Sequence, residues 1–221
     1  MADTLQKVGF YCGRVGDGFA GELQNSLSNL GFILAAGIGF AIWRSNARRE
    51  IFQLILIILA ASIGVGSFIF HSAPNTLTLQ LDLIPIQLFG LSAFFYAARR
   101  RFKLPLWGAI LAIAMFFVAR QGWIMVTPRG ALGGGITHIP TVALLITCGI
   151  LLARQRRPLG RYLIIASGFY VAALVVRTAD LLVCSRFPLG VHWAWHLLTA
   201  AVVGTVLIGI IRHPSTSPSA P

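Results

Sequence analysis

The sequence predicts an all-α polytopic membrane protein: a bundle of seven transmembrane helices with the N-terminus outside and the C-terminus in the cytoplasm. Of the 221 residues, 57% are hydrophobic and only 11% are charged, whereas a soluble domain carries about 25% charged residues. The apolar residues gather in seven runs, each close to the roughly 20 residues that a membrane helix needs. Basic residues collect between these runs, mainly on one side. These observations exclude a water-soluble domain.

The seven expected spans follow one another with short connections. They are residues 22–43, 51–71, 77–98, 104–120, 137–153, 160–183 and 190–211. The connection between the fourth and fifth spans contains the run Gly133-Gly134-Gly135, which is typical of a loop. We therefore expect residues 1–21 to form an extracytoplasmic segment and residues 22–211 a single membrane domain. Residues 212–221 are rich in proline and serine, which predicts a disordered cytoplasmic tail.

The distribution of basic residues predicts the orientation. Twelve of the 18 lysines and arginines lie in the connections after the first, third, fifth and seventh spans, five lie on the opposite side, and Arg177 falls within the sixth span. Cytoplasmic loops carry the excess of positive charge, so the N-terminus is expected outside. The same placement explains the net charge of +12 as a topology signal and argues against a nucleic-acid partner. The excess of arginine over lysine favours a bacterial inner membrane, with the outer side facing the periplasm.

Polar residues within the spans concentrate in the outer half of the predicted bundle. His71 closes the second span and Asp82 starts the third, while His192 and His196 open the seventh. Ser67 precedes His71 by one helical turn. The outer half also holds Glu22, His138, Arg177 and Asp180. Ionisable residues in a membrane are costly and usually functional, so this pattern predicts a polar cavity that opens to the outside.

The three histidines at this depth predict a catalytic zinc site. His192 and His196 are four residues apart, which separates them by only about 40° around a helix and lets both face one ion. His71 would supply the third ligand, and catalytic zinc commonly keeps three protein ligands and one open position. Asp82 could accept a proton from the attacking water. Ser67 could donate a hydrogen bond to the developing oxyanion.

Several of these residues also have structural interpretations. Asp82 could orient a histidine instead of moving a proton, and the Ser67 hydroxyl could bond to the backbone of its own helix. Arg177 and Asp180 are three residues apart and could form an intrahelical ion pair, although Arg177 could also hold a polar group of a substrate. His138 follows a glycine-rich loop and is expected to be structural.

Four segments carry a family resemblance. They are Gly21-Glu-Leu-Gln-Asn-Ser-Leu-Ser-Asn29, Gly66-Ser-Phe-Ile-Phe-His71, Gln80-Leu-Asp-Leu-Ile-Pro-Ile86 and His192-Trp-Ala-Trp-His196. In order and spacing they resemble the alkaline ceramidases, within the seven-helix hydrolase group that includes the adiponectin receptors. The resemblance implies zinc on His71, His192 and His196, and a part for Ser67 and Asp82 in amide hydrolysis. The implied substrate is ceramide or a related lipid amide, cleaved to a fatty acid and an amine.

The resemblance does not extend to a calcium site. Eukaryotic alkaline ceramidases bind calcium through carboxylates around a Trp-Cys pair and the glutamate of the first helix. Here the pair is Tyr11-Cys12, flanked by Phe10 and Gly13, and only Glu22 and Asp17 offer carboxylates. Calcium binding normally needs six or more oxygen ligands, so calcium dependence is not carried over.

Two other classes of function would use the same histidines. A heme-binding membrane protein would ligate iron through a pair of them, and a seven-helix receptor or transporter would bind a ligand without turnover.

A disulfide is also expected. Cys12 precedes the first span and Cys184 ends the sixth, so both would lie on the outer side, where disulfides can form. Cys148 lies inside the fifth span, away from both.

Overall fold

The computed structural model describes residues 12, 19–128 and 130–214. Within these residues every regular element is helical, and seven helices are long and apolar enough to cross a membrane. The predicted seven-helix, all-α fold is therefore confirmed, and the chain is an integral multi-pass membrane protein. The expected extracytoplasmic segment, apart from Cys12 and residues 19–21, and the tail beyond residue 214 lie outside the described residues.

The spans are close to the predicted ones. The first comprises η1 (Phe19–Glu22), α2 (Leu23–Ser28) and α3 (Leu30–Ser45). The others are α4 (Ile51–Ser72), α5 (Thr76–Tyr96) with the π-helical turn η2 (Ala97–Arg101), α6 (Leu106–Val126), η3 (Ala131–His138) with α7 (Ile139–Arg154), α8 (Leu159–Val183) and α9 (His192–Arg212).

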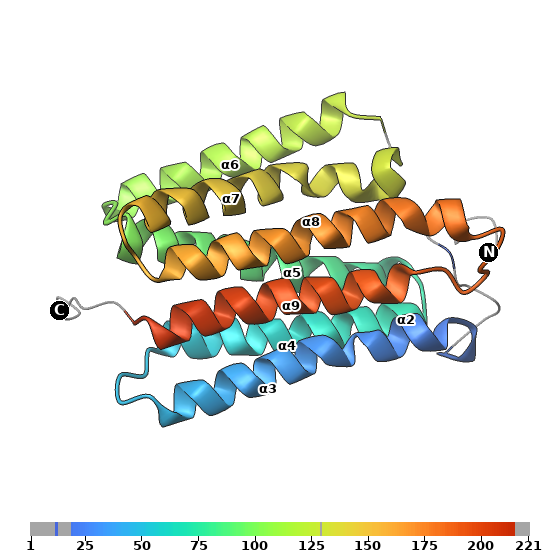
Figure 1. Ribbon diagram of the computed structural model, residues 1–221, viewed down its shortest axis with the longest axis horizontal. Coiled ribbons are helices and arrows are strands. Elements are labelled where there is room, and N and C mark those ends of the chain that lie inside the picture. Colours follow the sequence, from blue (N-terminus) through green and yellow to red (C-terminus); the bar gives the residue numbers. More distant parts are fainter. Residues whose placement is uncertain (1–11, 13–18, 129, 215–221) are drawn as a thin grey trace.

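The last helix occupies the middle of the bundle. In Figure 1, α9 lies between α8 and α4, with α3 beyond, and it contacts α3, α4 and α8. It is the most deeply buried of the seven spans. Small residues permit this packing: an added Cβ at Gly39 would lie 3.2 Å from Leu207 Cγ, and one at Gly204 would lie 3.1 Å from Ala35 Cβ. The histidine pair that begins α9 is therefore surrounded by protein.

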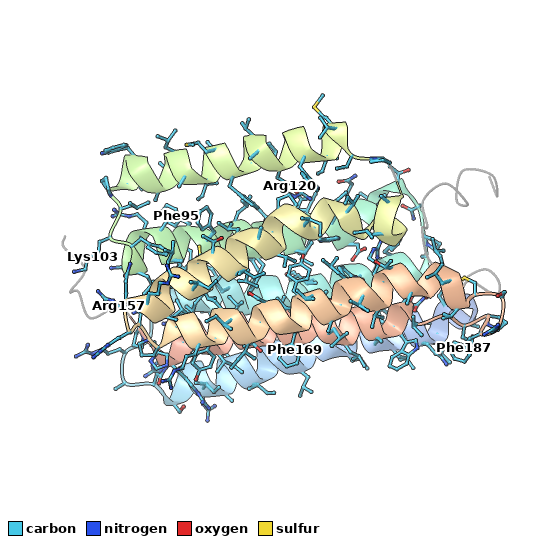
Figure 2. The ribbon with its side chains drawn as sticks, turned by 45° about the horizontal axis from the view of Figure 1, so that its top comes forward. Phe95, Lys103, Arg120, Arg157, Phe169 and Phe187 are labelled. Carbon is cyan, nitrogen blue, oxygen red and sulfur yellow. A yellow bond between two sulfur atoms is a disulfide. The ribbon has the colours of Figure 1, made fainter. Side chains whose placement is uncertain are left out.

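Helix α6 stands at the edge of the bundle, and its end differs from the prediction. Only Ala109 is buried on α6, which Figures 1 and 2 show along the outer side of α7. The fourth span was expected to end at residue 120, which would place Arg120 at its outer end. Instead α6 continues to Val126, because no proline occurs between Leu106 and Pro128 and a long arginine side chain is tolerated near a membrane interface.

The glycine-rich connection between α6 and α7 is ordered. It forms the 3₁₀ helix η3, in which Gly133 has a φ of 60°. A Cβ at Gly133 would lie 2.7 Å from the carbonyl oxygen of Arg177. Glycine at this position thus combines a left-handed conformation with a close approach to α8. Trp123 Nε1 donates a hydrogen bond to Ile136 O over 2.9 Å and ties the end of α6 to η3.

The two ends of the bundle differ in charge. The twelve basic residues that orient the prediction lie at the ends of α3, η2, α7 and α9, at the start of α8, and in the connections between these helices. The histidines lie toward the other end, where α4 and α8 finish and α9 begins. The segregation of charge expected from the sequence therefore exists. Which end faces the cytoplasm remains a prediction.

Candidate metal centre

Three histidines from two helices meet where α9 begins. His71 lies in the last turn of α4, and His192 and His196 lie in the first two turns of α9. One ring nitrogen of each lies within 4.8 Å of the others, and all three side chains are buried. The ring centroid of His71 is 5.6 Å from that of His192 and 4.7 Å from that of His196. This spacing suits three ligands of a single metal ion.

A carboxylate from the first span orients His71. Glu22 Oε2 lies 2.6 Å from His71 Nδ1, and both side chains are almost fully buried. An ionised carboxylate only accepts, so Nδ1 carries the proton and Nε2 is the nitrogen available to a metal. A histidine that ligates a metal commonly donates its other N–H to such a partner. Glu22 is the residue that resembles the calcium-binding glutamate of the first helix. In this structure it contacts His71, a candidate metal ligand.

A break in the first span holds His196 in a similar way. His196 Nδ1 lies 3.1 Å from the carbonyl oxygen of Asn25 and 2.8 Å from Ser28 Oγ. The Asn29 N–H bonds to Ser26 O at 3.3 Å, so it does not take the Asn25 carbonyl as it would in a regular α-helix. Since a carbonyl only accepts, His196 donates through Nδ1. Its Nε2 is left for a metal.

A close crossing of α4 and α5 brings a hydroxyl and a carboxylate together. A Cβ at Gly66 would overlap the carbonyl oxygen of Leu81 and lie 2.6 Å from its carbon. Pro85 has no N–H, so it leaves that carbonyl without its usual partner four residues on. Glycine at 66 and proline at 85 thus permit backbone-to-backbone contact beside Asp82. The same contact brings Ser67 close to Asp82.

Ser67 and Asp82 face each other at the edge of the histidine cluster. Ser67 is buried and Asp82 is half-buried. An added Cβ at Gly66, next to Ser67 in the chain, would lie 3.3 Å from the backbone nitrogen of Asp82, so the helix crossing brings Ser67 near Asp82. The Asp82 carboxylate also interacts electrostatically with His71. The start of α5 is fixed by Asn75, whose side chain accepts from the N–H groups of Leu77 and Thr78. Of the two interpretations of Ser67, this proximity favours a hydroxyl that faces the site over one that bonds only to its own helix.

Asp180 binds two backbone groups close to the start of α9. Its Oδ2 accepts from the Cys12 N–H at 2.6 Å and its Oδ1 from the Val191 N–H at 2.7 Å. Both oxygens are thus used by backbone groups, and the ion pair expected with Arg177 is not the role of this residue. The expected disulfide between Cys12 and Cys184 is confirmed, with a Cα–Cα separation of 5.8 Å. These contacts join Cys12 to the end of α8 and to the loop before α9.

Arg177 belongs to an aromatic cluster beside the histidines. Its guanidinium carbon lies 5.1 Å from the ring centroid of Trp195. His138, expected to be structural, packs 5.0 Å from the same ring, and its Nδ1 lies 2.9 Å from the Tyr170 hydroxyl. His138 is therefore engaged away from the three histidines. His213 packs on Tyr162 at the opposite end of the bundle.

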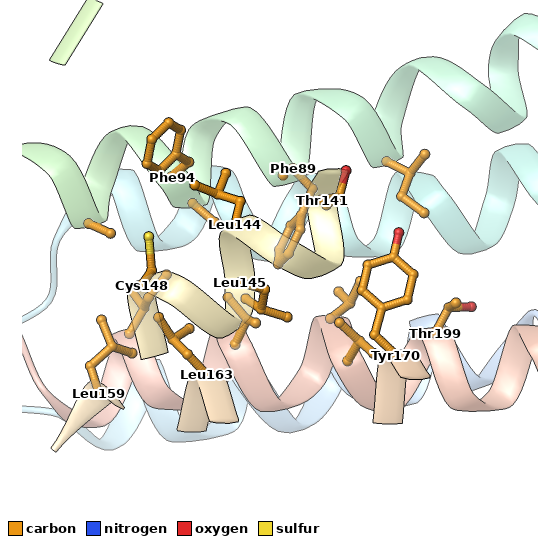
Figure 3. A pocket seen from close by; sticks show the side chains of 18 residues that line it. Phe89, Phe94, Thr141, Leu144, Leu145, Cys148, Leu159, Leu163, Tyr170 and Thr199 are labelled. Atoms are coloured by element: carbon orange, nitrogen blue, oxygen red, sulfur yellow. The ribbon is translucent and has the colours of Figure 1, made fainter. Parts of the chain in front are cut away.

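An apolar cavity of about 130 Å³ lies between α5, α7, α8 and α9. Figure 3 shows Tyr170 and Thr199 at one end and Cys148 and Leu159 toward the other. Thr199 lies one helical turn after His196, so the cavity begins close to the histidines and runs toward the opposite end of the bundle. Its walls are mainly aliphatic and aromatic side chains such as Phe89. The arrangement fits a hydrocarbon chain.

The comparison with protein families identifies the chain. The model of the family described as Ceramidase matches residues 17–219, nearly the whole length. The protein belongs to the Ceramidase family. No curated protein matches the chain. Membership in the family indicates a hydrolase that acts on amide bonds, and it confirms the resemblance carried by the four sequence segments.

The sequence prediction missed the residues that support the histidines. Glu22, Asn25 and Ser28 recur every three residues, which places a polar stripe on one face of a membrane helix. The sequence shows this polar stripe but not the side chains that it contacts. Those contacts span 49 and 171 residues of sequence, so they depend on how η1 and α2 pack against α4 and α9.

Proposed function

We propose that the protein is a zinc-dependent intramembrane amide hydrolase. It cleaves the N-acyl bond of ceramide or a related lipid amide to give a fatty acid and an amine. The observation that carries the proposal is the meeting of three buried histidines next to the Ser67–Asp82 pair, in a chain of the Ceramidase family. The components needed for hydrolysis of an amide are thereby available within one site.

The side chains at this site fit zinc. His71, His192 and His196 would hold the ion, since neutral imidazole nitrogen is a preferred zinc ligand. The partners of Nδ1 in His71 and His196 leave Nε2 of each ring for the metal. When bound, zinc supplies Lewis acidity, which makes a water molecule nucleophilic at neutral pH and polarises the amide carbonyl.

Asp82 and Ser67 would carry the proton and charge transfers. Asp82 accepts a proton from the attacking water and delivers it to the amide nitrogen as the C–N bond breaks. Ser67 donates a hydrogen bond to the oxygen of the former carbonyl as negative charge develops there. The products are a carboxylate and a protonated amine.

The apolar cavity would hold the acyl chain. Its end near Thr199 adjoins His196, so a chain lying in it would present its carbonyl toward the histidines. Burial of each methylene of such a chain is worth about 0.8 kcal/mol. The amine portion would then point toward the end of the bundle where α9 begins. We place that end on the periplasmic side of a bacterial inner membrane, as the basic residues indicate.

The test is release of free fatty acid by purified protein in neutral detergent. The substrates are N-acyl sphingoid bases with acyl chains of several lengths, and the matched control is the His196→Ala variant. We expect zinc-dependent release by the wild-type protein and loss of at least about 99% of it in the control, since removal of a catalytic group typically costs 10² or more.

Two other outcomes would redirect the proposal. Zinc-replete protein that hydrolyses no lipid amide or ester would support a receptor or transporter. A Soret absorption band in protein without zinc would support heme binding. A heme iron would use two axial histidines, whereas here one ring nitrogen from each of three histidines meets within 4.8 Å, which favours an ion held by three imidazoles.

A further inference from the structure

The loop between α8 and α9 leads directly into the candidate metal centre. Helix α8 ends at Val183, the disulfide cysteine Cys184 follows, and α9 begins with His192. The two helices pack side by side (Figure 1), so this loop sets how the start of α9 meets the end of α8. His192 is the first residue of its helix, and helix ends fray unless they are held. An imidazole that ligates a metal from this position therefore needs a fixed backbone.

The residue that starts α9 has no capping side chain of its own. Val191 stands at the N-cap position, and valine is among the poorest residues there. Its backbone is nevertheless held on both sides. The Val191 N–H donates to Asp180 Oδ1 at 2.7 Å, and the Val191 carbonyl accepts from the Ala194 N–H at 2.9 Å. The peptide before His192 is thus fixed from α8.

Asp180 brings a charge as well as a hydrogen bond to the start of α9. Its side chain is fully buried and lies one helical turn before Cys184. The peptide dipoles of α9 place partial positive charge at the N-terminus of that helix, where a carboxylate is stabilising. Asp180 therefore stabilises the start of α9 from a neighbouring helix, in the place of a capping side chain.

The second oxygen of Asp180 fixes Cys12 to the same place. Oδ2 accepts from the Cys12 N–H at 2.6 Å, and the disulfide holds the Cys12 side chain on Cys184. Gly190 packs against both partners: its φ is 62°, and an added Cβ would overlap Asp180 Oδ1 and Cys12 Cβ. Glycine is needed here for the backbone conformation and for the close contact. Asp180 therefore joins Cys12, the end of α8 and the start of α9.

We propose that Asp180 is a positioning residue for the candidate metal centre. It fixes the peptide before His192 and so directs the His192 ring toward His71 and His196. The centroids of these two rings lie 5.6 and 4.7 Å from that of His192. Residues of the first span hold His71 and His196 through Nδ1, and α8 holds His192 through its backbone. The part of this inference that concerns zinc rests on the proposed function.

The first test measures zinc affinity in Asp180→Asn by competition with a fluorescent chelator. The amide keeps the shape, but it removes the charge and turns a donor toward one of the two N–H groups. We expect zinc to bind about tenfold more weakly, the effect of losing a residue that orients a metal ligand. Ser167→Ala is the matched control, because Ser167 is buried on the same helix and its hydroxyl bonds to Leu163 O. An unchanged affinity in Asp180→Asn would overturn the inference.

A spectroscopic readout separates positioning from stability. Cobalt(II) can replace zinc, and its visible absorption depends on how the ligands are arranged around the ion. At saturating cobalt the spectrum of Asp180→Asn should differ from that of the wild type, whereas Ser167→Ala should match it. Weaker zinc binding with an unchanged cobalt spectrum would assign the effect of Asp180→Asn to stability alone, and the inference would fail.

Failure of this inference can be distinguished from failure of the hydrolase proposal. If the wild-type protein binds neither zinc nor cobalt, the zinc site is wrong, and hydrogen–deuterium exchange of the metal-free protein decides on Asp180. The Ala194 N–H should exchange about tenfold faster in Asp180→Asn, because the first turn of α9 loses a buried partner. Equal exchange in the two proteins would overturn the positioning role.

A second variant serves if Asp180→Asn does not fold. In Gly190→Ala the added methyl group would displace Asp180, so the same changes in zinc affinity, cobalt spectrum and exchange are expected. Gly168→Ala on α8 is its control, since nothing lies within 4 Å of an added Cβ there. Identical behaviour of Gly190→Ala and Gly168→Ala would count against the inference.

Discussion

His71 Nδ1 and Glu22 Oε2 lie 2.6 Å apart, and this contact links the second span to the first beside the histidine cluster. The contact makes Nε2 the nitrogen of His71 that would bind a metal, and such a carboxylate partner fixes the orientation of a ligating ring. Glu22 is 3% exposed, so its charge is supported by this contact rather than by water. The first span thus contributes to the metal centre without supplying a ligand.

Replacing this carboxylate should weaken metal binding. In Glu22→Gln the amide keeps the shape but loses the charge, and zinc affinity should fall by about 10- to 100-fold, as for other partners of ligating histidines. Competition with a fluorescent zinc chelator measures the change. Glu50→Gln, at the opposite end of the bundle, is the matched control. An unchanged affinity in Glu22→Gln would show that the contact does not tune the site.

The close crossing of α4 and α5 at Gly66 should be needed for turnover but not for zinc binding. In Gly66→Ala the new methyl group would overlap Leu81 O, so α4 and α5 must move apart and the Ser67–Asp82 contact should be disturbed. We expect turnover to fall by about 10²-fold, the size of effect caused by misplacement of catalytic groups, while zinc is retained. Gly37→Ala is the control, because nothing lies within 4 Å of an added Cβ there. Equal activity in the two variants would contradict the role of the crossing.

Asp82 and Ser67 should prove catalytic and not structural. Asp82→Asn removes the proton acceptor, and we expect turnover to fall by about 10² or more. Ser67→Ala should lose on the order of 10² if the hydroxyl stabilises the oxyanion. Zinc content, measured on the same samples, should largely remain in both. Full activity in Ser67→Ala would limit that hydroxyl to a structural bond, and a trapped acyl-enzyme would identify serine as the nucleophile.

The disulfide should be present in the protein as extracted. Without reductant, Cys12 and Cys184 should resist alkylation, and after reduction a membrane-impermeant reagent should label both from the periplasmic side. Cys12→Ser should lower the free energy of unfolding by about 2–5 kcal/mol, as for other native disulfides. Labelling of both thiols before reduction would refute the bond. Labelling only from the cytoplasmic side would reverse the orientation.

The fold was predictable because bilayer thickness and loop charge leave strong signals in sequence. All seven spans were found. The main error was to end the fourth span at residue 120, where Arg120 interrupts the apolar run. The gathering of His71, His192 and His196 followed from depth alone. The contacts that support these histidines could not be predicted from sequence. The helix break at Asn29 gives His196 its carbonyl partner, and Gly66 contacts Leu81. Both features depend on how the helices are rotated and crossed.

Metal content tests the central claim, that His71, His192 and His196 form one zinc site. The measurement is inductively coupled plasma mass spectrometry on purified wild-type protein and the three single His→Ala variants, with His138→Ala as the control because that ring bonds to Tyr170. The account predicts one zinc per chain in the wild type and in His138→Ala, and loss of most of it in each of the three variants. Zinc content unchanged in all three would contradict the account.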